Sequence, residues 1–357
     1  MNTVLPQDRN HLQLALTLAQ TQRGFCAPNP AVGAVIVDQY NQVIATGYHQ
    51  GPGHSHAEVD ALQKLDFNAL GATLYVTLEP CSHWGKTPPC TSTILKSGIQ
   101  RVVFAFHDPN PSVSGNGREV LEAKGIRCDQ LSLPEINEFY TSYVHWLNTG
   151  KPYVTAKLAL SLDGKIAKAS GDPLVITGDS LREFTHCSRK KSDAILTTSK
   201  TILHDNPQMN VREENHTIAK TVYVLDSSLQ LNSHANIFST AKSITLFYSN
   251  EVAIDRAEAL ERQGVRCIAI DETPEGLDLS AVLTYIGQDG IHDLWVEAGG
   301  HCFSSFANHH LLQRALIYVA PRWFGEGMQA FSTALNFATG QCEWRQYGND
   351  VLCDIRY

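Results

Sequence analysis

The sequence lacks any long apolar run, and this absence argues against a membrane-spanning protein. Nowhere in its 357 residues does an apolar stretch approach the ~18–20 residues that a transmembrane helix needs. The first residues, MNTVLPQDRNHLQ, place polar and charged side chains where a signal peptide carries its apolar core. We therefore expect a cytoplasmic protein with no membrane partner.

Basic residues are too few for a general nucleic-acid-binding protein. The chain has 28 Lys and Arg against 36 Asp and Glu, which gives a formal net charge of −8. Proteins that bind nucleic acids normally carry a basic excess, so we expect no nucleic-acid partner. Low-complexity tracts and internal repeats are also absent, and 43% hydrophobic and 18% charged residues are typical of an ordinary globular protein.

The cysteines do not form the even set of a disulfide scaffold. There are nine of them, spread over the whole length, and no export signal accompanies them. An intracellular chain keeps such residues as thiols or metal ligands, so we expect no disulfide bridges.

Strands and helices alternate along the first half, which predicts an α/β sandwich. Apolar periodicity indicates helices at 7–22, 56–65, 91–98 and 117–126, and strands at 31–37, 43–49, 73–80 and 101–109. A closing helix is expected over 134–152, which ends in Gly-Lys-Pro. Because the length favours two domains, we place the boundary there and expect domains at 1–148 and 152–357.

The second half restarts the same alternation. Its expected strands are 152–160, 193–198, 221–226, 243–249, 265–270, 293–299, 314–321 and 351–357, and its expected helices lie near 179–191, 251–263, 277–287 and 301–309. Residues 205–219 and 323–348 show no clear periodicity, and we interpret them as loops.

Three short pieces of the first half carry metal-ligand residues: His56-Ala57-Glu58, Pro80-Cys81 and Cys90. One neutral imidazole and two thiolates give three protein ligands, the number that catalytic zinc sites use while leaving a fourth position for water. Cys81 follows a predicted strand, whereas His56 and Cys90 begin predicted helices, where the helix dipole favours a thiolate and a neutral imidazole. The sequence therefore predicts that His56, Cys81 and Cys90 bind Zn2+.

Glu58 is the expected catalytic residue of this site. Zinc makes a hydroxide available near neutral pH, and the hydroxide would attack an amidine-like ring carbon. Glu58 would take the water proton and deliver it to the ring nitrogen and the leaving ammonia. The pattern is similar to the H-x-E and P-C-x-x-C signature of zinc deaminases, although the two cysteines here lie nine positions apart.

Other interpretations of these residues stay open. A His-x-Glu pair often arises by chance, and burial as apolar thiols is a common fate of residues such as Cys81 and Cys90. A structural zinc site would take His83 as a fourth ligand and would leave Glu58 without a task. Two competing functions are a zinc-stabilised binding module and a nucleoside or nucleobase deaminase with an unrelated second domain.

Longer motifs resemble one enzyme family over nearly the whole chain. They include PNPAVGAVIV (28–37), TLEPCSHWGKTPPC (77–90), KLALSLDGKIA (157–167) and LWVEAGG (294–300). In this order they resemble the bifunctional deaminase–reductase family of riboflavin biosynthesis. The resemblance implies a cytidine-deaminase-like three-layer αβα domain followed by a dihydrofolate-reductase-like α/β domain, in a protein that forms homo-oligomers.

The resemblance also implies a small-molecule substrate and two successive reactions. The first is the zinc-dependent hydrolytic deamination of 2,5-diamino-6-(5-phosphoribosylamino)pyrimidin-4(3H)-one. The second is the NADPH-dependent reduction of the ribosyl side chain to ribityl. The two reactions imply two cofactors, Zn2+ in the first domain and NADPH in the second.

By resemblance, the substrate contacts of the deaminase fall at Asn29, His49, Lys86, Asp108 and Asn110. Lys86 lies between the two cysteines, where its ammonium group would meet a substrate phosphate as a point charge. Asn29 and Asn110 stand beside Pro residues and also suit turns, so a structural role stays open for both.

The usual dinucleotide fingerprint is absent from the reductase half, although a hydride transfer needs a nicotinamide. Gly299-Gly300 follows a predicted strand and opens a predicted helix, whose backbone N–H groups would face a pyrophosphate. By resemblance, the NADPH contacts fall at Ala159, Val175, Thr201, Asp205, Ser227, Gly299, Gly300, His301, Cys302, Phe303, Ser304 and Ser305. The substrate contacts of this half fall at Pro173, Arg189, Met209, Arg212 and Glu297.

Three of these residues differ from a simple binding pattern, two by residue type and one by its sequence context. Pro173 and Val175 stand where relatives often carry Ser and Trp, which alters the polar substrate contact and the aromatic packing on the cofactor. Arg189 belongs to a Ser-Arg-Lys-Lys run that by itself indicates a solvated helix face. The resemblance instead places its planar guanidinium against the substrate, where Arg suits a phosphate.

Overall fold

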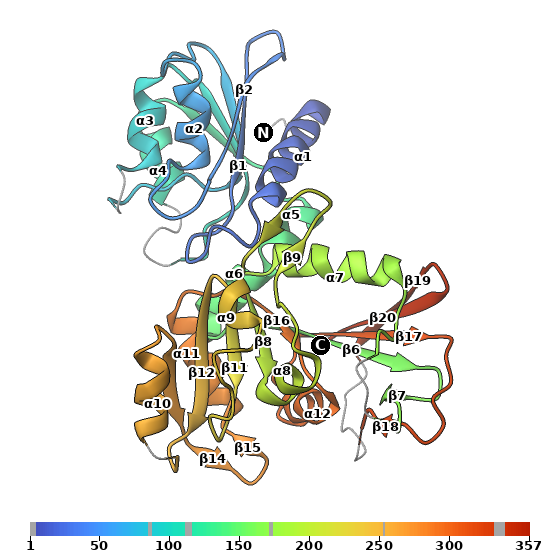
Figure 1. Ribbon diagram of the computed structural model, residues 1–357. Helices are drawn as coiled ribbons and strands as arrows, with labels where there is room; N and C mark the ends of the chain where they lie inside the picture. The colour runs from blue at the N-terminus through green and yellow to red at the C-terminus, as the bar shows by residue number, and fades with distance from the viewer. Residues whose placement is uncertain (1–4, 85–87, 111–115, 171–173, 253, 332–339) are drawn as a thin grey trace. The chain divides into compact units, whose positions relative to one another are not determined.

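The computed structural model describes residues 5–84, 88–110, 116–170, 174–252, 254–331 and 340–357. The chain divides into two units, Met1–Thr149 and Gly150–Tyr357, and Figure 1 colours it from blue at the amino terminus to red at the carboxy terminus. None of the helices in the described ranges is both long and apolar enough to cross a membrane.

A five-stranded sheet in the order β2-β1-β3-β4-β5 forms the centre of the amino-terminal unit. The strands are β1 (Gly33–Val37), β2 (Val43–Tyr48), β3 (Thr73–Leu78), β4 (Arg101–Phe106) and β5 (Arg127–Gln130). β1 pairs antiparallel with β2 and β3, whereas β3, β4 and β5 run parallel. The predicted hairpin and the predicted α/β alternation are both present.

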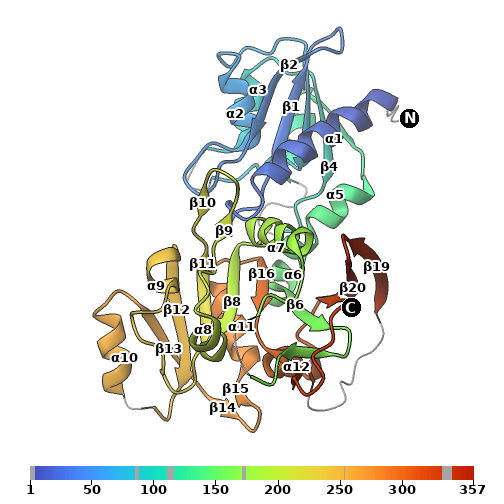
Figure 2. The same ribbon diagram turned by 45° about the vertical axis from the view of Figure 1, so that its right-hand side comes forward.

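Among the described residues, six helices cover the two faces of this sheet. They are α1 (Pro6–Thr21), α2 (Ala57–Gln63), α3 (Cys90–Lys96), α4 (Asn116–Glu122), α5 (Pro134–Phe139) and α6 (Thr141–Thr149). Because alternate strand residues point to opposite faces, Ala34 and Ile36 pack with α2, α3 and α4, while Val35 and Val37 pack with α1 and α5. Figure 2 shows α1 and α2 on opposite sides of β1. The predicted three-layer αβα architecture is confirmed.

The single closing helix expected over 134–152 is wrong. The structure has two helices, α5 and α6, with Tyr140 between them. The Tyr140 ring is buried, its hydroxyl lies 2.7 Å from Thr77 Oγ1, and the same hydroxyl donates to the Ala31 carbonyl at 3.1 Å. These tertiary contacts fix the position of the ring, and helical periodicity does not report them.

A nine-stranded sheet forms the centre of the carboxy-terminal unit, in the order β13-β12-β11-β8-β16-β6-β17-β20-β19. The strands in chain order are β6 (Tyr153–Ser161), β8 (Ala194–Thr198), β11 (Thr221–Leu225), β12 (Ser243–Ser249), β13 (Arg266–Ile270), β16 (Asp293–Glu297), β17 (Arg314–Ala320), β19 (Gln341–Tyr347) and β20 (Asp350–Arg356). The strands are parallel from β13 to β17, and β20 and β19 add antiparallel pairs.

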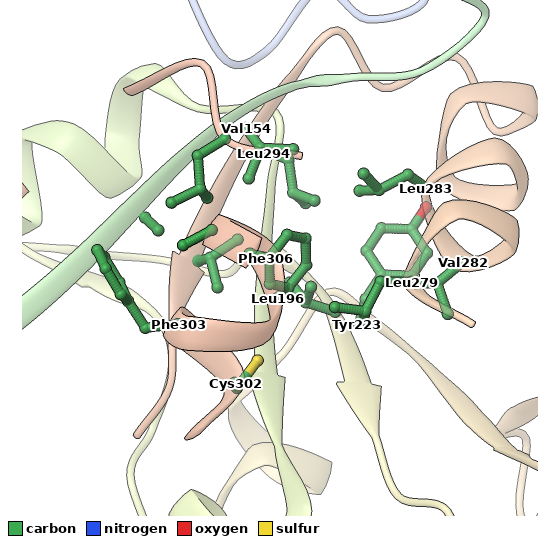
Figure 3. Packing of buried hydrophobic residues seen from close by; sticks show 14 of the residues in the cluster. Val154, Leu196, Tyr223, Leu279, Val282, Leu283, Leu294, Cys302, Phe303 and Phe306 are labelled. Atoms are coloured by element: carbon green, nitrogen blue, oxygen red, sulfur yellow. The ribbon is translucent and has the colours of Figure 1, made fainter. Parts of the chain in front are cut away.

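Helices cover both faces of the large sheet. They are α7 (Asp179–Lys191), α8 (Ser199–Asp205), α9 (Ile237–Thr240), α10 (Ile254–Glu261), α11 (Leu279–Gln288) and α12 (Gly300–Asn308). α11 and α12 belong to one buried cluster, and α7 to α10 to the other. Figure 3 shows Phe303 and Phe306 of α12 packed in the first cluster with Leu279 and Leu283 of α11.

The interpretation of 205–219 and 323–348 as loops is wrong in part. The first segment contains a short antiparallel pair, β9 (Val211–Arg212) with β10 (Thr217–Ile218). The second contains β19 and the two-residue β18 (Met328–Gln329), which pairs with β7 (Lys165–Ala167). A further small pair joins β14 (Glu272–Thr273) to β15 (Gly276–Leu277). β19 was not predicted because the side chains of this edge strand are mostly exposed on both faces. Such a strand lacks the apolar alternation from which a strand is predicted.

Candidate metal and cofactor sites

The three predicted metal ligands lie together in the amino-terminal unit. Cys81 lies just beyond the end of β3, Cys90 is the first residue of α3, and His56 directly precedes α2. Their ligand atoms all lie within 4.8 Å of one another. His56 Nδ1 is 3.2 Å from Cys90 Sγ and 3.5 Å from Cys81 Sγ, so Nδ1 is the ring nitrogen that faces both sulfurs.

These distances fit a tetrahedral zinc ion. Zinc bonds of about 2.3 Å to sulfur and about 2.0 Å to nitrogen, at tetrahedral angles, separate the two ligand atoms by roughly 3.5 Å. Within the described residues the group has three members, and His83, the alternative fourth ligand, is exposed and outside it. Three ligands leave one position for water, which is the arrangement of catalytic zinc sites.

The electrostatics of the two thiols favour a thiolate at this place. The hydrogen bond from the Cys90 thiol, together with the His56 ring, outweighs burial and lowers the pKa of Cys81 to about 4. The Cys90 backbone N–H also donates to Cys81 Sγ at 3.4 Å. The pairing with Cys81 and burial raise the pKa of Cys90. One sulfur is therefore prepared as an anionic ligand before a metal ion binds.

Cys90→Ser is expected to lose zinc, because an alcohol replaces a thiolate ligand that zinc prefers. Elemental analysis of the purified protein should show the metal content falling from about one zinc per chain to near zero. Cys187→Ser is the matched control, since Cys187 is an exposed free cysteine of the other unit, and it should keep its zinc. Retention of zinc by Cys90→Ser would contradict the ligand set.

Glu58 lies in the first turn of α2, two residues after His56, and is 4% exposed. Burial raises the pKa of Glu58 to about 7, and the charges of the neighbouring Cys81 and His56 act in opposite directions on it. A carboxyl group whose pKa is close to the working pH can both accept and release a proton. Its place beside the ligands allows Glu58 to handle the protons of a bound water.

Asn29 and His49 lie on one side of the metal cluster. The His49 ring packs edge-on against the His56 ring, with centroids 5.4 Å apart. His49 Nδ1 is 3.0 Å from the Ser55 carbonyl, so this nitrogen carries the proton, and Nε2 accepts from Asn29 Nδ2 at 3.1 Å. Burial lowers the pKa of His49, and the neutral ring holds the Asn29 amide beside the metal cluster.

Asp108 and Asn110 follow β4, whose carboxyl end neighbours that of β3. Asp108 is buried, and its Oδ1 accepts from the Asn110 backbone N–H at 2.9 Å and from the Tyr143 hydroxyl at 3.4 Å. Burial raises the pKa of Asp108, and the charges of Glu79 and Cys81 add to this effect. Tyr143 was not predicted, and its place in an apolar helical pattern offered no signal. The predicted contact Lys86 lies outside the described residues.

A cavity of about 980 Å³ opens in the carboxy-terminal unit at the carboxyl ends of β8, β11 and β16, the usual place for a ligand in a parallel sheet. Of the predicted cofactor contacts, Ala159, Val175, Thr201, Asp205, Ser227, Gly299, Gly300, His301, Cys302 and Ser305 line it. Of the predicted substrate contacts, Arg189, Met209 and Glu297 line it.

Three of the predicted contacts of this unit are placed differently. Phe303 and Ser304 do not line the cavity: Phe303 packs in the core (Figure 3), and the Ser304 hydroxyl donates to the Gly300 carbonyl. A helix turns successive side chains to different faces, so only part of the 299–305 run can face one ligand. Arg212 does not line the cavity and bonds to Asn210 Oδ1 at 3.0 Å. Pro173 lies outside the described residues.

Gly299 and Gly300 form the start of α12 at the wall of the cavity. A Cβ atom at Gly300 would lie 1.6 Å from the Ala330 carbonyl oxygen, whereas one at Gly299 would meet nothing within 4 Å. Gly300 is therefore required by close backbone approach. The start of the helix presents backbone N–H groups and the positive end of the dipole, which suits a pyrophosphate.

Gly300→Ala is expected to weaken NADPH binding, because the clash with Ala330 displaces the start of α12. Titration followed by nicotinamide fluorescence should show at least a tenfold weaker Kd, which corresponds to about 1.4 kcal/mol. Gly287→Ala is the matched control: a Cβ atom there would lie 1.9 Å from the Gly150 carbonyl oxygen, but Gly287 does not line the cavity, so the Kd of the folded variant should change far less. Equal effects of the two substitutions would show that the loss does not come from the start of α12.

Arg189 and Glu297 form a buried ion pair on the wall of this cavity. Arg189 Nη2 donates to Glu297 Oε2 at 2.8 Å, its Nη1 donates to the Asn210 carbonyl at 2.8 Å, and the Trp295 indole donates to Glu297 Oε1 at 2.6 Å. Burial would raise the pKa of Glu297, but Arg189 outweighs it and the pKa falls to about 2. Arg189 is 8% exposed, so the interpretation as a solvated helix residue is wrong.

Sequence reasoning missed two further polar residues, Lys157 at this wall and His186, which does not line the cavity. Lys157 of β6 lines the cavity beside Glu297, and burial lowers its pKa. His186 of α7 accepts the Arg212 backbone N–H at 3.2 Å, and burial together with Arg189 and Arg212 lowers its pKa to about 4. A lysine inside an otherwise apolar strand pattern was the available signal for Lys157.

Comparison with known proteins links both halves of the chain to described families. Residues 5–106 match the cytidine and deoxycytidylate deaminase zinc-binding region, and residues 152–353 match the RibD C-terminal domain. The riboflavin biosynthesis protein RibD of Aquifex aeolicus is 37% identical over 325 residues, which cover 90% of this chain and 89% of that protein. RibD of Escherichia coli is 35% identical over 340 residues, covering 92% and 91%.

Solved structures agree with these matches. The structure of Acinetobacter baumannii RibD superposes with a TM-score of 0.85 at 32% identity and covers 98% of both chains. A Thermotoga maritima structure, described as a diaminohydroxyphosphoribosylaminopyrimidine deaminase/5-amino-6-(5-phosphoribosylamino)uracil reductase, superposes with a TM-score of 0.82 at 31% identity, again over 98% of both chains.

Proposed function

The chain belongs to the RibD family of riboflavin biosynthesis proteins, and we propose that each of its two domains catalyses one reaction of that family. The domain at 1–148 deaminates 2,5-diamino-6-(5-phosphoribosylamino)pyrimidin-4(3H)-one with Zn2+. The domain at 152–357 reduces the ribosyl group of the product to ribityl with NADPH. The observation that carries the proposal is the convergence of His56, Cys81 and Cys90 beside the buried Glu58.

In the deaminase, each residue has one physical task. His56, Cys81 and Cys90 hold the zinc ion, which when bound supplies a nucleophilic hydroxide near neutral pH. Glu58 takes one proton from the attacking water and delivers it to the ring nitrogen. It then takes the second proton from the hydroxyl group on the ring carbon and delivers it to the amino group, which leaves as neutral ammonia while the carbonyl forms. Asn29, held by His49, and Asp108 contact the polar edge of the pyrimidine, while Asn110 and Lys86 complete the substrate contacts.

In the reductase, the cavity orients the two reactants of the hydride transfer. The start of α12 at Gly299 and Gly300 binds the pyrophosphate of NADPH, which supplies the hydride. Arg189 and Glu297 form a charged wall against the phosphoribosyl substrate, and Met209 also lines the cavity. Lys157, beside Glu297, places an additional donor at the same wall.

We further propose that this protein is cytoplasmic, forms a homo-oligomer and has no nucleic-acid partner. The net charge of −8 supports the last point, and the family resemblance supports the oligomer. Light scattering coupled to size-exclusion chromatography would give the mass in solution. A mass of one chain, about 39.3 kDa, would contradict the oligomer.

One assay separates this function from its competitors. The protein is supplied first with the diaminopyrimidine ribotide, and ammonia release is followed; NADPH is then added, and its oxidation is followed. Both signals are expected. Ammonia without NADPH oxidation would remove the reductase assignment and leave a deaminase with an unrelated second domain, and the absence of both signals would favour a binding module.

A further inference from the structure

Glu79 is a buried side chain that the deaminase mechanism leaves without a task. It follows the end of β3, precedes Cys81 by two residues and is 3% exposed. Its Oε2 lies 2.9 Å from His107 Nδ1, and its Oε1 accepts the Arg118 backbone N–H at 3.1 Å. Buried polar groups are costly unless they are hydrogen-bonded, so these two donors account for a carboxyl group at this depth.

The two donors lie on either side of the predicted deaminase contacts Asp108 and Asn110 in the sequence. His107 directly precedes Asp108, and Arg118 lies in the first turn of α4. The backbone reinforces both attachments: the Glu79 N–H donates to the Phe106 carbonyl at 2.9 Å, and a Cβ atom at Gly117 would lie 2.0 Å from the Pro80 carbonyl oxygen. Glu79 thus attaches both His107 and the start of α4 to the end of β3, which leads into Cys81.

Asp108 is the predicted substrate contact nearest to this attachment, because it directly follows His107. It is buried, and its carboxylate accepts from the Asn110 backbone N–H and the Tyr143 hydroxyl. Tyr143 holds Asp108 from α6, while Glu79, just beyond the end of β3, holds the preceding residue, His107. Asp108 and Asn110 are therefore oriented by contacts from two different elements.

We propose that Glu79 is a positioning residue of the deaminase, which holds Asp108 and Asn110 in place for the substrate through its bonds to His107 and Arg118. This inference rests on the proposed function, because it takes Asp108 and Asn110 as substrate contacts. Glu79 touches neither the substrate nor a predicted metal ligand in this role. Its loss therefore weakens substrate binding and leaves zinc and the proton transfer at Glu58 in place.

The first test is His107→Ala, since the His107 side chain is 45% exposed and its removal leaves the core intact. Ammonia release is measured against the concentration of the diaminopyrimidine ribotide, with zinc content and NADPH oxidation measured on the same samples. We expect the KM to rise about tenfold, the size of a lost hydrogen bond to a charged group, with kcat within about twofold and zinc unchanged.

Variants of Glu79 itself extend the test. Glu79→Ala should raise the KM at least as much as His107→Ala, and the double variant should be no worse than Glu79→Ala. Glu79→Gln should rescue most of the effect, because the Gln amide keeps an acceptor for the Arg118 N–H and a donor for the imidazole. Glu122→Ala is the matched control: it breaks the surface pair of Arg118 with Glu122 on α4 and should leave the KM unchanged.

Asp108→Ala tests the substrate contact of Asp108 separately from the positioning role of Glu79. If it leaves the KM unchanged, the assignment of Asp108 as a substrate contact fails, and the proposal for Glu79 fails with it. If it raises the KM but His107→Ala and Glu79→Ala do not, the contact stands and the role of Glu79 is refuted. Loss of zinc, or a fall in kcat at constant KM in His107→Ala, would identify a structural role and also overturn the proposal.

Discussion

Glu58→Gln is expected to keep zinc at about one ion per chain and to reduce ammonia release by about a hundredfold to ten-thousandfold, the usual contribution of a general acid–base residue. Gln has the shape of Glu but cannot accept and return a proton. The Glu58 side chain is buried beside the ligands, so bulk water cannot easily take over its proton transfer. Metal analysis and steady-state ammonia release on the same preparation measure both effects.

Asp60→Asn provides the matched control for this result. Asp60 is another acidic residue in the first turn of α2, but its carboxylate accepts from Lys64 Nζ at 2.9 Å and from the Tyr48 backbone N–H at 3.2 Å. Its neutralisation should cost little turnover. Loss of zinc from Glu58→Gln would indicate a ligand or structural role for Glu58, and full turnover would exclude it as the proton carrier.

The architecture was predictable where one periodicity dominates. The helix at 7–22 places Leu12, Ala15 and Leu16 on one face, and the structure buries all three in α1. The parallel strands of the second half are nearly continuous apolar runs, as expected for strands that are covered on both faces. Such segments carry their structure locally, and the predicted and observed bounds differ by only a few residues.

Prediction failed where tertiary contacts decide the local structure. Tyr140 separates α5 from α6 because its hydroxyl bonds to the sheet. The short helix α8 is a different case, since its local signal was overlooked: Thr198 before the helix is a recognised cap, and its hydroxyl accepts the Thr201 N–H at 3.2 Å. The exposed strand β19 lacks such a signal, since its pairing with β20 and not its composition makes it a strand.

The candidate sites show the same division. Residue type and spacing predicted that His56, Cys81 and Cys90 belong together, because a His-x-Glu and two cysteines at element ends match the ligands and proton carrier of a catalytic zinc site. The Ser-Leu-Asp-Gly motif at 161–164, by contrast, contributed only to the family resemblance and predicted no contact. In the structure, Asp163 accepts the Phe324 and Gly325 backbone N–H groups at 3.1 and 2.8 Å. A partner about 160 positions away leaves no trace in the local pattern.

Glu297→Gln is expected to remove most NADPH oxidation while ammonia release stays unchanged. Neutralising one member of a buried ion pair leaves the other charge without compensation, at a cost of about 3–5 kcal/mol. Here the uncompensated group is Arg189, and Lys157 lies on the same wall. The two cations would repel each other without the carboxylate, and the surface that receives the phosphoribosyl group would lose its shape.

Asp354→Asn distinguishes this effect from a general loss of stability. Asp354 is also buried and pairs with Arg314 at 2.6 Å on the neighbouring strands β17 and β20, and neither residue lines the cavity. Both variants should lower the Tm, but only Glu297→Gln should lose NADPH oxidation at a temperature where both are folded. If Asp354→Asn loses the same activity, Glu297 acts through the fold alone. If Glu297→Gln retains NADPH oxidation, the charged wall has no part in the reduction, and the phosphoribosyl substrate must be held elsewhere in the cavity.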